Sequence, residues 1–188
     1  VPKSVIKSFP KGILNIHPSL LPKYRGPTPV PTAILEGKEK TGISIIKIDE
    51  EADHGPVLIQ KEEKISPEDT LETLLDRLFK IGAELLPDVI ERYIKGEIEL
   101  VEQKHNLATF TKALKKEDGL IDLENPPPPD LLDRMIRAYY PWPGVYTKFR
   151  IKNQELRIKF MPGKKIQVEG KIPIAYKDFI NGYAGGRD

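Results

Sequence analysis

An amide and an imidazole lie close together near the N-terminus, at Asn15 and His17, and a carboxylate follows at Asp53. An imidazole can carry a proton near neutral pH, and a neighbouring carboxylate can orient the ring and favour its charged form. An amide N–H group can donate to an oxygen that becomes negative during acyl transfer. These three groups are sufficient for moving an acyl unit onto an amine.

The same part of the chain allows other interpretations. Ser19 with His17 and Asp53 could form a hydrolase triad, but no Gly-x-Ser-x-Gly elbow surrounds Ser19. His17, Asp53 and His54 could bind a metal ion, yet the sequence has no His-Glu-x-x-His or comparable ligand spacing, so we expect no metal site. An Asn-x-His pair can also be a local hydrogen-bonding pair, and His105 is expected at the surface.

The element that must position the amide and the imidazole is the short apolar segment 13–17, which lies between a glycine and a proline and predicts a strand. Because side chains alternate along a strand, Asn15 and His17 would share one face. Two polar groups on an interior strand are costly unless they are paired or solvated at its end. Ligands bind at the carboxyl ends of strands in open α/β sheets, so this strand end is the candidate site.

The segments that follow alternate between β-rich and helical patterns. We expect a proline-rich loop over 18–31, a helix over 30–35, strands over 43–48 and 57–65, and helical structure over 70–95. A turn is expected at Thr41-Gly42, and a polar connection over 49–55 carries Asp53. Gly82 and Pro87 interrupt the helical spacing, which predicts two consecutive helices or one helix with a bend.

The C-terminal part opens with four prolines at 126–129, which predict a stiff extended connection. The expected elements after it are a helix over 131–138, strands over 145–151, 156–160 and 166–168, and a helix over 176–181. Closely spaced strands of this kind favour a small barrel or a curled sheet. We expect Trp142 to be a packing anchor at the domain junction rather than a base-stacking platform.

Composition indicates a globular protein. The chain has 188 residues, of which 39% are hydrophobic and 31% charged, with a formal net charge of +2. These values exclude an acidic disordered tail and a uniformly basic nucleic-acid coat. No apolar run approaches the ~18 residues of a membrane span. The absence of cysteine excludes disulfides, thiolate zinc sites and cysteine nucleophiles, and favours a cytoplasmic location.

Charge is unevenly distributed along the chain. Residues 145–188 hold 10 Lys and Arg against 4 Asp and Glu, a balance of +6, whereas residues 1–144 hold 20 against 24, a balance of −4. The basic C-terminal part fits contact with RNA phosphates.

The chain begins at Val1 without an initiator methionine, so we treat it as a possible fragment.

The motif Asn15-x-His17-x-Ser19-Leu20-Leu21-Pro22-x-Tyr24-Arg25-Gly26, with Asp53-His54-Gly55-Pro56 downstream, resembles the formyltransferase family that uses 10-formyltetrahydrofolate. Later stretches, among them 137–144 and 177–183, are similar to the branch of that family that formylates methionyl-tRNA. The resemblance covers nearly the whole chain, although it implies that a further N-terminal half of the catalytic domain precedes Val1.

The resemblance implies specific sites. Asn15, His17 and Asp53 fall on the catalytic positions of the family, and Ser19, Leu20, Leu21 and Pro22 fall on its folate-contacting segment. Asn15 would stabilise the oxyanion, His17 would shuttle protons, and Asp53 would orient His17. The neighbouring basic residues Lys23 and Arg25 could touch the folate tail or an RNA end, but such residues are usually just solvated.

The implied fold is α/β: a partial Rossmann-like catalytic domain over 1–104, followed by a short OB-like β-barrel domain over 105–188. The implied reaction transfers a formyl group from 10-formyltetrahydrofolate to the amino group of initiator methionyl-tRNA, and we expect a monomer. Two alternatives stay open, a sugar-nucleotide amine N-formyltransferase and a non-catalytic remnant that binds RNA or folate.

Overall fold

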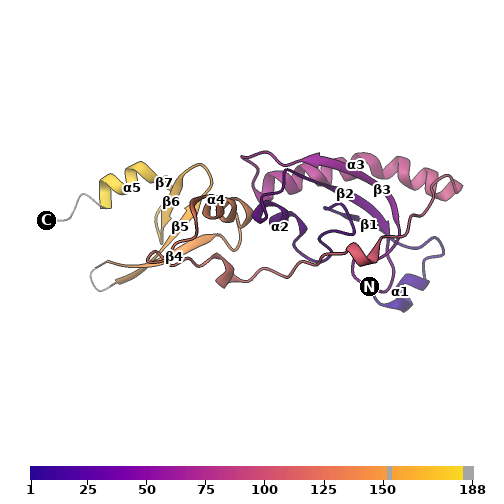
Figure 1. Ribbon diagram of the computed structural model, residues 1–188, viewed down its shortest axis with the longest axis horizontal. Helices are drawn as coiled ribbons and strands as arrows, with labels where there is room; N and C mark the ends of the chain where they lie inside the picture. The colour runs from indigo at the N-terminus through magenta and orange to yellow at the C-terminus, as the bar shows by residue number, and fades with distance from the viewer. Residues whose placement is uncertain (152–153, 184–188) are drawn as a thin grey trace. The chain divides into compact units, whose positions relative to one another are not determined.

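The computed structural model describes residues 1–151 and 154–183, and the chain divides into two compact units, Val1–Ala113 and Leu114–Asp188 (Figure 1). The division falls later than the boundary expected at 104 and 105. Residues 105–113 lie with unit 1 because their backbone pairs with the loop after the first strand: the amide of Arg25 donates to the carbonyl of Thr109 at 2.8 Å, and the amide of Thr111 donates to that of Arg25 at 2.7 Å.

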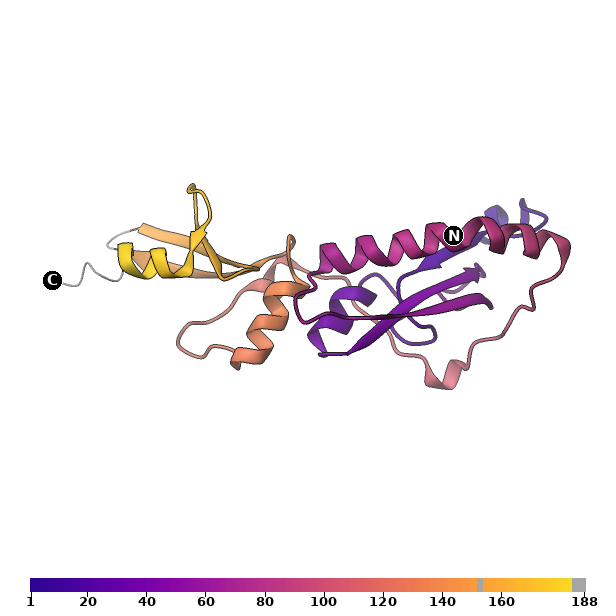
Figure 2. The same cartoon turned by 90° about the horizontal axis from the view of Figure 1, so that it is seen from above.

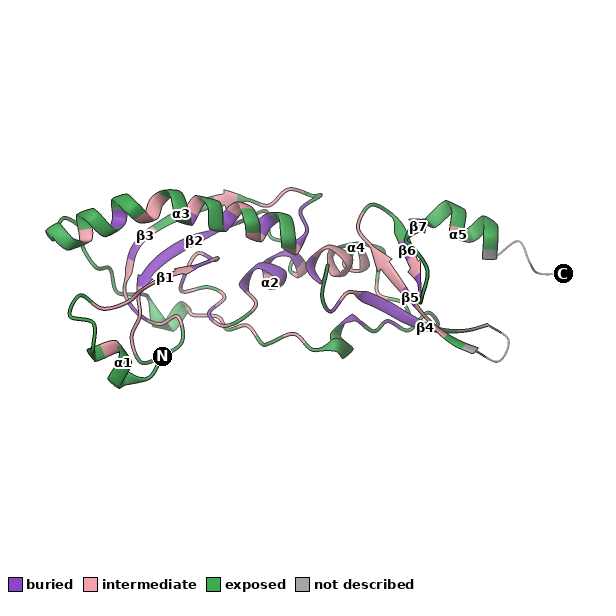
Figure 3. Ribbon diagram, turned by 180° about the vertical axis from the view of Figure 1, so that it is seen from behind, coloured by how far each residue is buried: buried purple, intermediate pink, exposed green. Residues whose placement is uncertain are grey.

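Unit 1 is built on a three-stranded antiparallel sheet in the order β1 (Leu14–His17), β2 (Lys40–Lys47) and β3 (Val57–Lys64). The central strand β2 is buried along most of its length (Figure 3). The long helix α3 (Leu71–Lys95) runs alongside this sheet, as Figure 2 shows. The buried apolar side chains of this unit are Leu21, Val30, Ala33, Ile34, Ile43, Ile45, Ile46, Leu58, Leu74, Leu78 and Val89.

Two short helices complete unit 1, α1 (Lys3–Lys7) and α2 (Pro29–Leu35), together with the 3-10 turn η1 (His105–Leu107). Helix α2 begins with proline at its first position, where the missing amide costs no hydrogen bond. It confirms the helix expected over 30–35. Neither α1 nor η1 was predicted, because both are too short to show a hydrophobic period.

Helix α3 is one continuous helix rather than two. The hydroxyl of Thr70 accepts the amide of Thr73 at the N-terminus, and Gly96 adopts the left-handed conformation after the last turn. Pro87 lies inside it, so packing of its apolar face against the sheet outweighs one missing hydrogen bond. Gly82 is required by close packing, since a Cβ there would lie 2.7 Å from a methyl carbon of Ile16.

The expected turn at Thr41-Gly42 was wrong, because both residues lie inside β2. A Cβ on Gly42 would come within 2.4 Å of the carbonyl oxygen of Lys61 and 2.5 Å of a side-chain carbon of Leu20. The glycine therefore serves the close approach of β3 and of the loop that follows β1, not a reversal of the chain.

The carboxylate of Asp69 anchors the start of α3. It is 5% exposed and accepts hydrogen bonds from the amide of Ser66, the hydroxyl of Thr73 and the guanidinium of Arg77. Burial raises the pKa of Asp69, but these donors, Arg77 foremost, outweigh burial and hold the pKa below its ordinary value.

Replacing Asp69 with asparagine is expected to lower the free energy of unfolding by about 1–3 kcal/mol at pH 7, since charged hydrogen bonds to Arg77 are lost. Because the folded-state pKa of Asp69 lies below 3.8, the ionised carboxylate stabilises the fold above about pH 3.8, and this contribution disappears as the pH falls through the folded-state pKa. Urea unfolding at pH 7 and pH 3 measures both effects. Asp76→Asn, which removes an exposed pair with Lys80, is the control, and equal losses in the two variants would contradict the prediction.

Unit 2 is β-rich. Its antiparallel sheet has the order β4 (Val145–Ile151), β5 (Gln154–Met161), β6 (Lys165–Val168) and β7 (Ile174–Ala175), and its helices are η2 (Lys116–Gly119), α4 (Pro129–Ala138) and α5 (Tyr176–Tyr183). The three strands and two helices expected here are confirmed, and β7 and η2 are additional. Among the described residues no pairing joins β7 to β4, so the sheet is not closed into a barrel.

One expectation for unit 2 was wrong. The proline run is not extended throughout, because Pro129 starts α4 at the position where proline fits a helix. Trp142 is 55% exposed, and its expected role as a packing anchor at the domain junction stays a prediction. In the part of the chain that the structure describes, no helix has the length and apolar character needed to cross a membrane.

Candidate active site

The structure brings His17 and Asp53 together. His17 is the last residue of β1 and is 4% exposed, while Asp53 lies in the connection between β2 and β3. The imidazole Nδ1 and the carboxylate Oδ1 are 3.4 Å apart. The pair thus lies where a strand ends, as the strand pattern predicted, although the neighbouring strands are antiparallel.

Both nitrogens of His17 face oxygen atoms that can only accept a hydrogen bond. Nε2 donates to the backbone carbonyl of Tyr24 at 3.0 Å, and Nδ1 faces Asp53. When the ring carries protons on both nitrogens, each N–H therefore has an acceptor. The arrangement fixes the orientation of the ring and suits a group that holds a proton and gives it up.

Asp53 is held in its ionised form. Burial raises the pKa of this carboxyl, but the His17 ring, the amide of Gly26 and the guanidinium of Arg25 together lower it below its ordinary value. The Gly26 amide donates to Oδ2 at 2.8 Å, which leaves Oδ1 for the imidazole. The Asp53 side chain is 18% exposed, against 5% for His17, so the carboxylate is the more accessible of the two groups.

Asn15 lies on the same strand as His17, two positions earlier, and the alternation of side chains places both on one face of β1. It is half-buried and stands opposite Ile46 of β2. Within the described residues its amide makes no hydrogen bond to another side chain or to the backbone. Its two N–H donors are thus available to a substrate.

The segment Ser19 to Pro22 is packed rather than open. Ser19 and Leu21 are buried, whereas Leu20 and Pro22 are half-buried. The hydroxyl of Ser44 on β2 holds this segment: it donates to the carbonyl of Ser19 at 2.6 Å and accepts the amide of Leu21 at 3.1 Å. Only Leu20, Pro22 and backbone groups of this segment can touch a ligand without rearrangement.

Replacing Ser44 with alanine is expected to lower the free energy of unfolding by about 1–3 kcal/mol, because the buried amide of Leu21 loses its acceptor. The measurement is urea unfolding of the chain, followed by the fluorescence of its tyrosines and tryptophan. Ser8→Ala removes an exposed hydroxyl and is the matched control. A stability equal to that of the control would show that Ser44 does not hold the segment.

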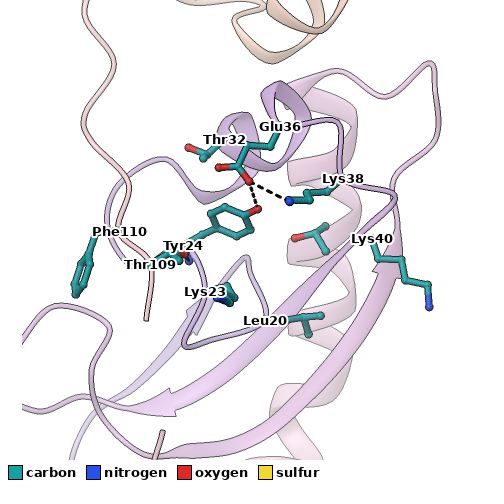
Figure 4. A pocket seen from close by; sticks show the side chains of 10 residues that line it. Leu20, Lys23, Tyr24, Thr32, Glu36, Lys38, Lys40, Thr109 and Phe110 are labelled. Carbon is teal, nitrogen blue, oxygen red and sulfur yellow. Dashed lines mark hydrogen bonds and ion pairs between the residues drawn. The ribbon is translucent and has the colours of Figure 1, made fainter. Parts of the chain in front are cut away.

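A pocket of about 340 Å³ opens beside this segment (Figure 4). Leu20, Lys23 and Thr109 contribute to its wall. The hydroxyl of Tyr24 donates to Glu36 at 2.6 Å, and burial together with that carboxylate raises the pKa of Tyr24. Of the lysines that line the pocket, Lys38 pairs with Glu36 and Lys40 pairs with Glu62. The ammonium group of Lys23 and the apolar part of the wall suit a ligand that has both an anionic part and an apolar part.

Two alternative sites are not assembled. The hydroxyl of Ser19 donates to the carbonyl of Lys23 at 2.6 Å, while both nitrogens of His17 face other groups, so no serine triad is formed. His54 turns away from His17, with its Nδ1 2.6 Å from Asp49 and its ring stacked on that of His105. In the described ranges no set of three metal-binding side chains gathers.

Sequence reasoning missed two buried side chains at the site. Arg25, which was expected to be solvated, is only 3% exposed, because Nε and Nη2 both donate to Oε1 of Gln103. Gln103 is itself 6% exposed. A sequence motif cannot show that Arg25 and Gln103 are buried against each other, since the two residues lie far apart in the sequence. His105 is exposed, as expected.

Comparison with known protein families gives two matches, one in each unit. Residues 1–90 match the family model described as formyl transferase, and residues 113–162 match the one described as formyl transferase, C-terminal domain. The second match begins next to the division between the two units, after Ala113.

Two relatives carry the same description, methionyl-tRNA formyltransferase. The chain is 51% identical over 156 residues to the protein of Chloroflexus aggregans, a match that covers 83% of this chain and 49% of the relative. It is 40% identical over 210 residues to the protein of Koribacter versatilis, covering 97% of this chain and 67% of the relative. The chain therefore spans between half and two thirds of the length of these relatives.

The fold is also similar to that of HypX from Aquifex aeolicus. That structure superposes with a TM-score of 0.71 at 17% identity, over 98% of this chain and 38% of HypX. HypX in complex with tetrahydrofolic acid superposes with a TM-score of 0.66 at 16% identity, over 92% of this chain and 35% of HypX. Identity this low establishes a shared fold and no more.

Proposed function

The chain belongs to the formyltransferase family, and we propose from this premise that it transfers a formyl group from 10-formyltetrahydrofolate to the amino group of methionyl-tRNA. The evidence for methionyl-tRNA as the acceptor is the 40–51% identity of the chain to relatives described as methionyl-tRNA formyltransferases. The contact between His17 and Asp53 supports the chemistry.

The proposed reaction is a direct transfer in which an amine attacks the formyl carbon and the folate nitrogen leaves. Asn15 would donate an N–H group to the formyl oxygen as it becomes negative. His17, once protonated and with Nε2 released from the carbonyl of Tyr24, would give a proton from Nε2 to the leaving nitrogen and then take one from the attacking amine. Asp53 would hold the ring by its Nδ1 and compensate its positive charge.

The residues present fit a folate donor in part. Leu20 and Pro22 offer apolar surface, and the nearby pocket adds the ammonium group of Lys23, which suits a carboxylate of a folate tail. Ser19 and Leu21 would contribute through their backbone, because their side chains are buried. The donor supplies the formyl group, and the chain contributes orientation and proton transfer.

The alternative acceptor is a sugar-nucleotide amine, for which the same three residues would serve. The level of identity to methionyl-tRNA formyltransferases favours tRNA, and the balance of +6 over residues 145–188 supports contact with its phosphates. The remnant alternative, a protein that binds RNA or folate without catalysis, would lack any turnover.

The deciding experiment incubates the chain with 10-formyltetrahydrofolate and charged initiator tRNA and measures formylmethionyl-tRNA. The same assay is applied to a chimera in which this chain replaces the matching part of the Koribacter versatilis relative. Formylation by either protein supports the proposal, with loss of the product when His17 is replaced. Absence of formylation by both, while the relative itself is active, would overturn it.

We also propose that unit 1 is part of a Rossmann-like domain, that the open sheet of unit 2 is related to an OB-like fold, and that the protein is cytoplasmic and monomeric. Sedimentation of the chain tests the monomeric state.

A further inference from the structure

We propose that Gln103, in the segment that follows α3, is a positioning residue that holds Asp53 against His17. Gln103 makes no hydrogen bond to the side chain of either member of the pair, and its bond to Asp53 is to the backbone carbonyl. It acts through the backbone of the turn that carries Asp53 and through the guanidinium of Arg25. The catalytic part of the inference rests on the proposed function, and the geometric part does not.

The Gln103 side chain is fully used in hydrogen bonds although it is 6% exposed. Nε2 donates to the carbonyl of Asp53 at 2.9 Å and to that of Gly55 at 2.7 Å. Oε1 accepts from Nε of Arg25 at 3.1 Å and from Nη2 at 2.7 Å. Two donors and two lone pairs are thus all satisfied, and no apolar residue of the same size could replace them.

Gln103 bonds Arg25, and the two residues on either side of Arg25 touch the reactive pair. The carbonyl of Tyr24 accepts from Nε2 of His17, and the amide of Gly26 donates to Oδ2 of Asp53. Arg25 lies between them, and its side chain reaches Gln103. One side chain therefore connects the loop that holds the imidazole to the turn that holds the carboxylate.

The turn needs such a connection. Asp53 adopts a φ of 52°, a left-handed conformation that L-residues with side chains rarely adopt, and Tyr24 adopts a φ of 60°. Conformations of this kind persist where the surroundings hold them. Hydrogen bonds from Gln103 to the carbonyls on both sides of His54 supply that support for Asp53.

A second contact secures the other side of the same turn. Nη2 of Arg25 donates to Nδ1 of His105 at 2.8 Å, and the ring of His105 stacks on that of His54 with 3.9 Å between centroids. His54 in turn contacts Asp49. Arg25 is thereby fixed at its guanidinium end, which makes it a rigid link between Gln103 and the loop.

The test replaces Gln103 with methionine, which has similar volume and no comparable hydrogen bonds. Gln167→Met is the matched control, since Gln167 makes one hydrogen bond in unit 2. Nitrogen-15 NMR of the imidazole of His17, in the chain itself, reports the geometry without any assay of activity. We expect the His17 ring signals to move in Gln103→Met and to stay in place in Gln167→Met, and unchanged signals in both would overturn the proposal.

The kinetic test uses the chain or the chimera, whichever formylates. We expect Gln103→Met to lower kcat ~10–100-fold and to change KM for both substrates less than about twofold, because misplacing a reacting group affects the chemical step. A wild-type kcat would overturn the proposal. If this variant does not fold, Gln103→Glu decides, because it keeps the acceptor for Arg25 and loses the donor to both carbonyls. The same fall in kcat supports the proposal, and wild-type kcat refutes it. Absence of activity in both the unmodified chain and the chimera would refute the proposed function instead, while the NMR result would still stand.

Discussion

Replacing His17 with alanine is expected to lower the rate of formyl transfer by ~10²–10⁴, because the group that carries the proton is removed. Replacing Asn15 with alanine is expected to cost ~10²–10³, the usual loss for one donor to an oxyanion. Initial rates of formylation at saturating donor and acceptor measure both effects. The control is Asn125→Ala, at an exposed position outside residues 145–188.

The two variants differ in their expected stability. The ring of His17 is buried and contacts Asp53 and the carbonyl of Tyr24, so its loss also destabilises the fold. Asn15 makes no such contact among the described residues, and its variant should melt close to the unmodified chain. Rates are therefore corrected for the folded fraction. If either variant formylates at the rate of Asn125→Ala, the role assigned to the replaced residue is refuted.

Replacing Asp53 with asparagine is expected to lower kcat on the order of 10²–10⁴, since the ring of His17 loses the charge that orients it and favours its protonated form. Asparagine keeps the shape of the side chain and can still accept the amide of Gly26. A loss of rate then reports the charge rather than the packing.

The pH dependence of stability gives an independent measure of the same carboxylate. The pKa of Asp53 is lower in the folded chain than its ordinary value of 3.8, so its ionised form stabilises the fold above about pH 3.8 and this contribution vanishes as the pH falls through the folded-state pKa. Asp53→Asn should remove that contribution. The control for the stability measurement is Asp122→Asn, at an exposed position. For the rate measurement, an unchanged kcat in Asp53→Asn would contradict the role assigned to Asp53.

Local patterns predicted the elements that lie beside the site. The strand 13–17 was predicted because it is apolar and bounded by a glycine and a proline, and the structure places β1 there, with His17 as its last residue. The resemblance to a known family pointed to Asp53 beside His17, and the structure places the two in contact. Its role in catalysis, and that of Asn15, stay predictions.

Long-range packing is what local patterns could not show. Gly42 was predicted to lie in a turn, yet it lies inside β2. The absence of a side chain there lets the backbone of Lys61 and the side chain of Leu20 pack closely against it. Pro87 predicted either a break between two helices or a bend in one, and the structure has one continuous helix, whose apolar face is buried. Arg25 looked like a solvated cation, and its partner Gln103 is 78 positions away in the sequence. Each of these outcomes depends on a neighbour that only the fold supplies.

The pairing of residues 105–113 with the loop after β1 determines where the first unit can be cut free. A truncation after residue 104 would keep Gln103 but discard Thr109 and Thr111, whose backbones clamp Arg25, and His105, which fixes its guanidinium. Such a fragment would look complete by its helices and strands and still have a loosened reaction centre. Expression of unit 1 alone should therefore extend through Ala113.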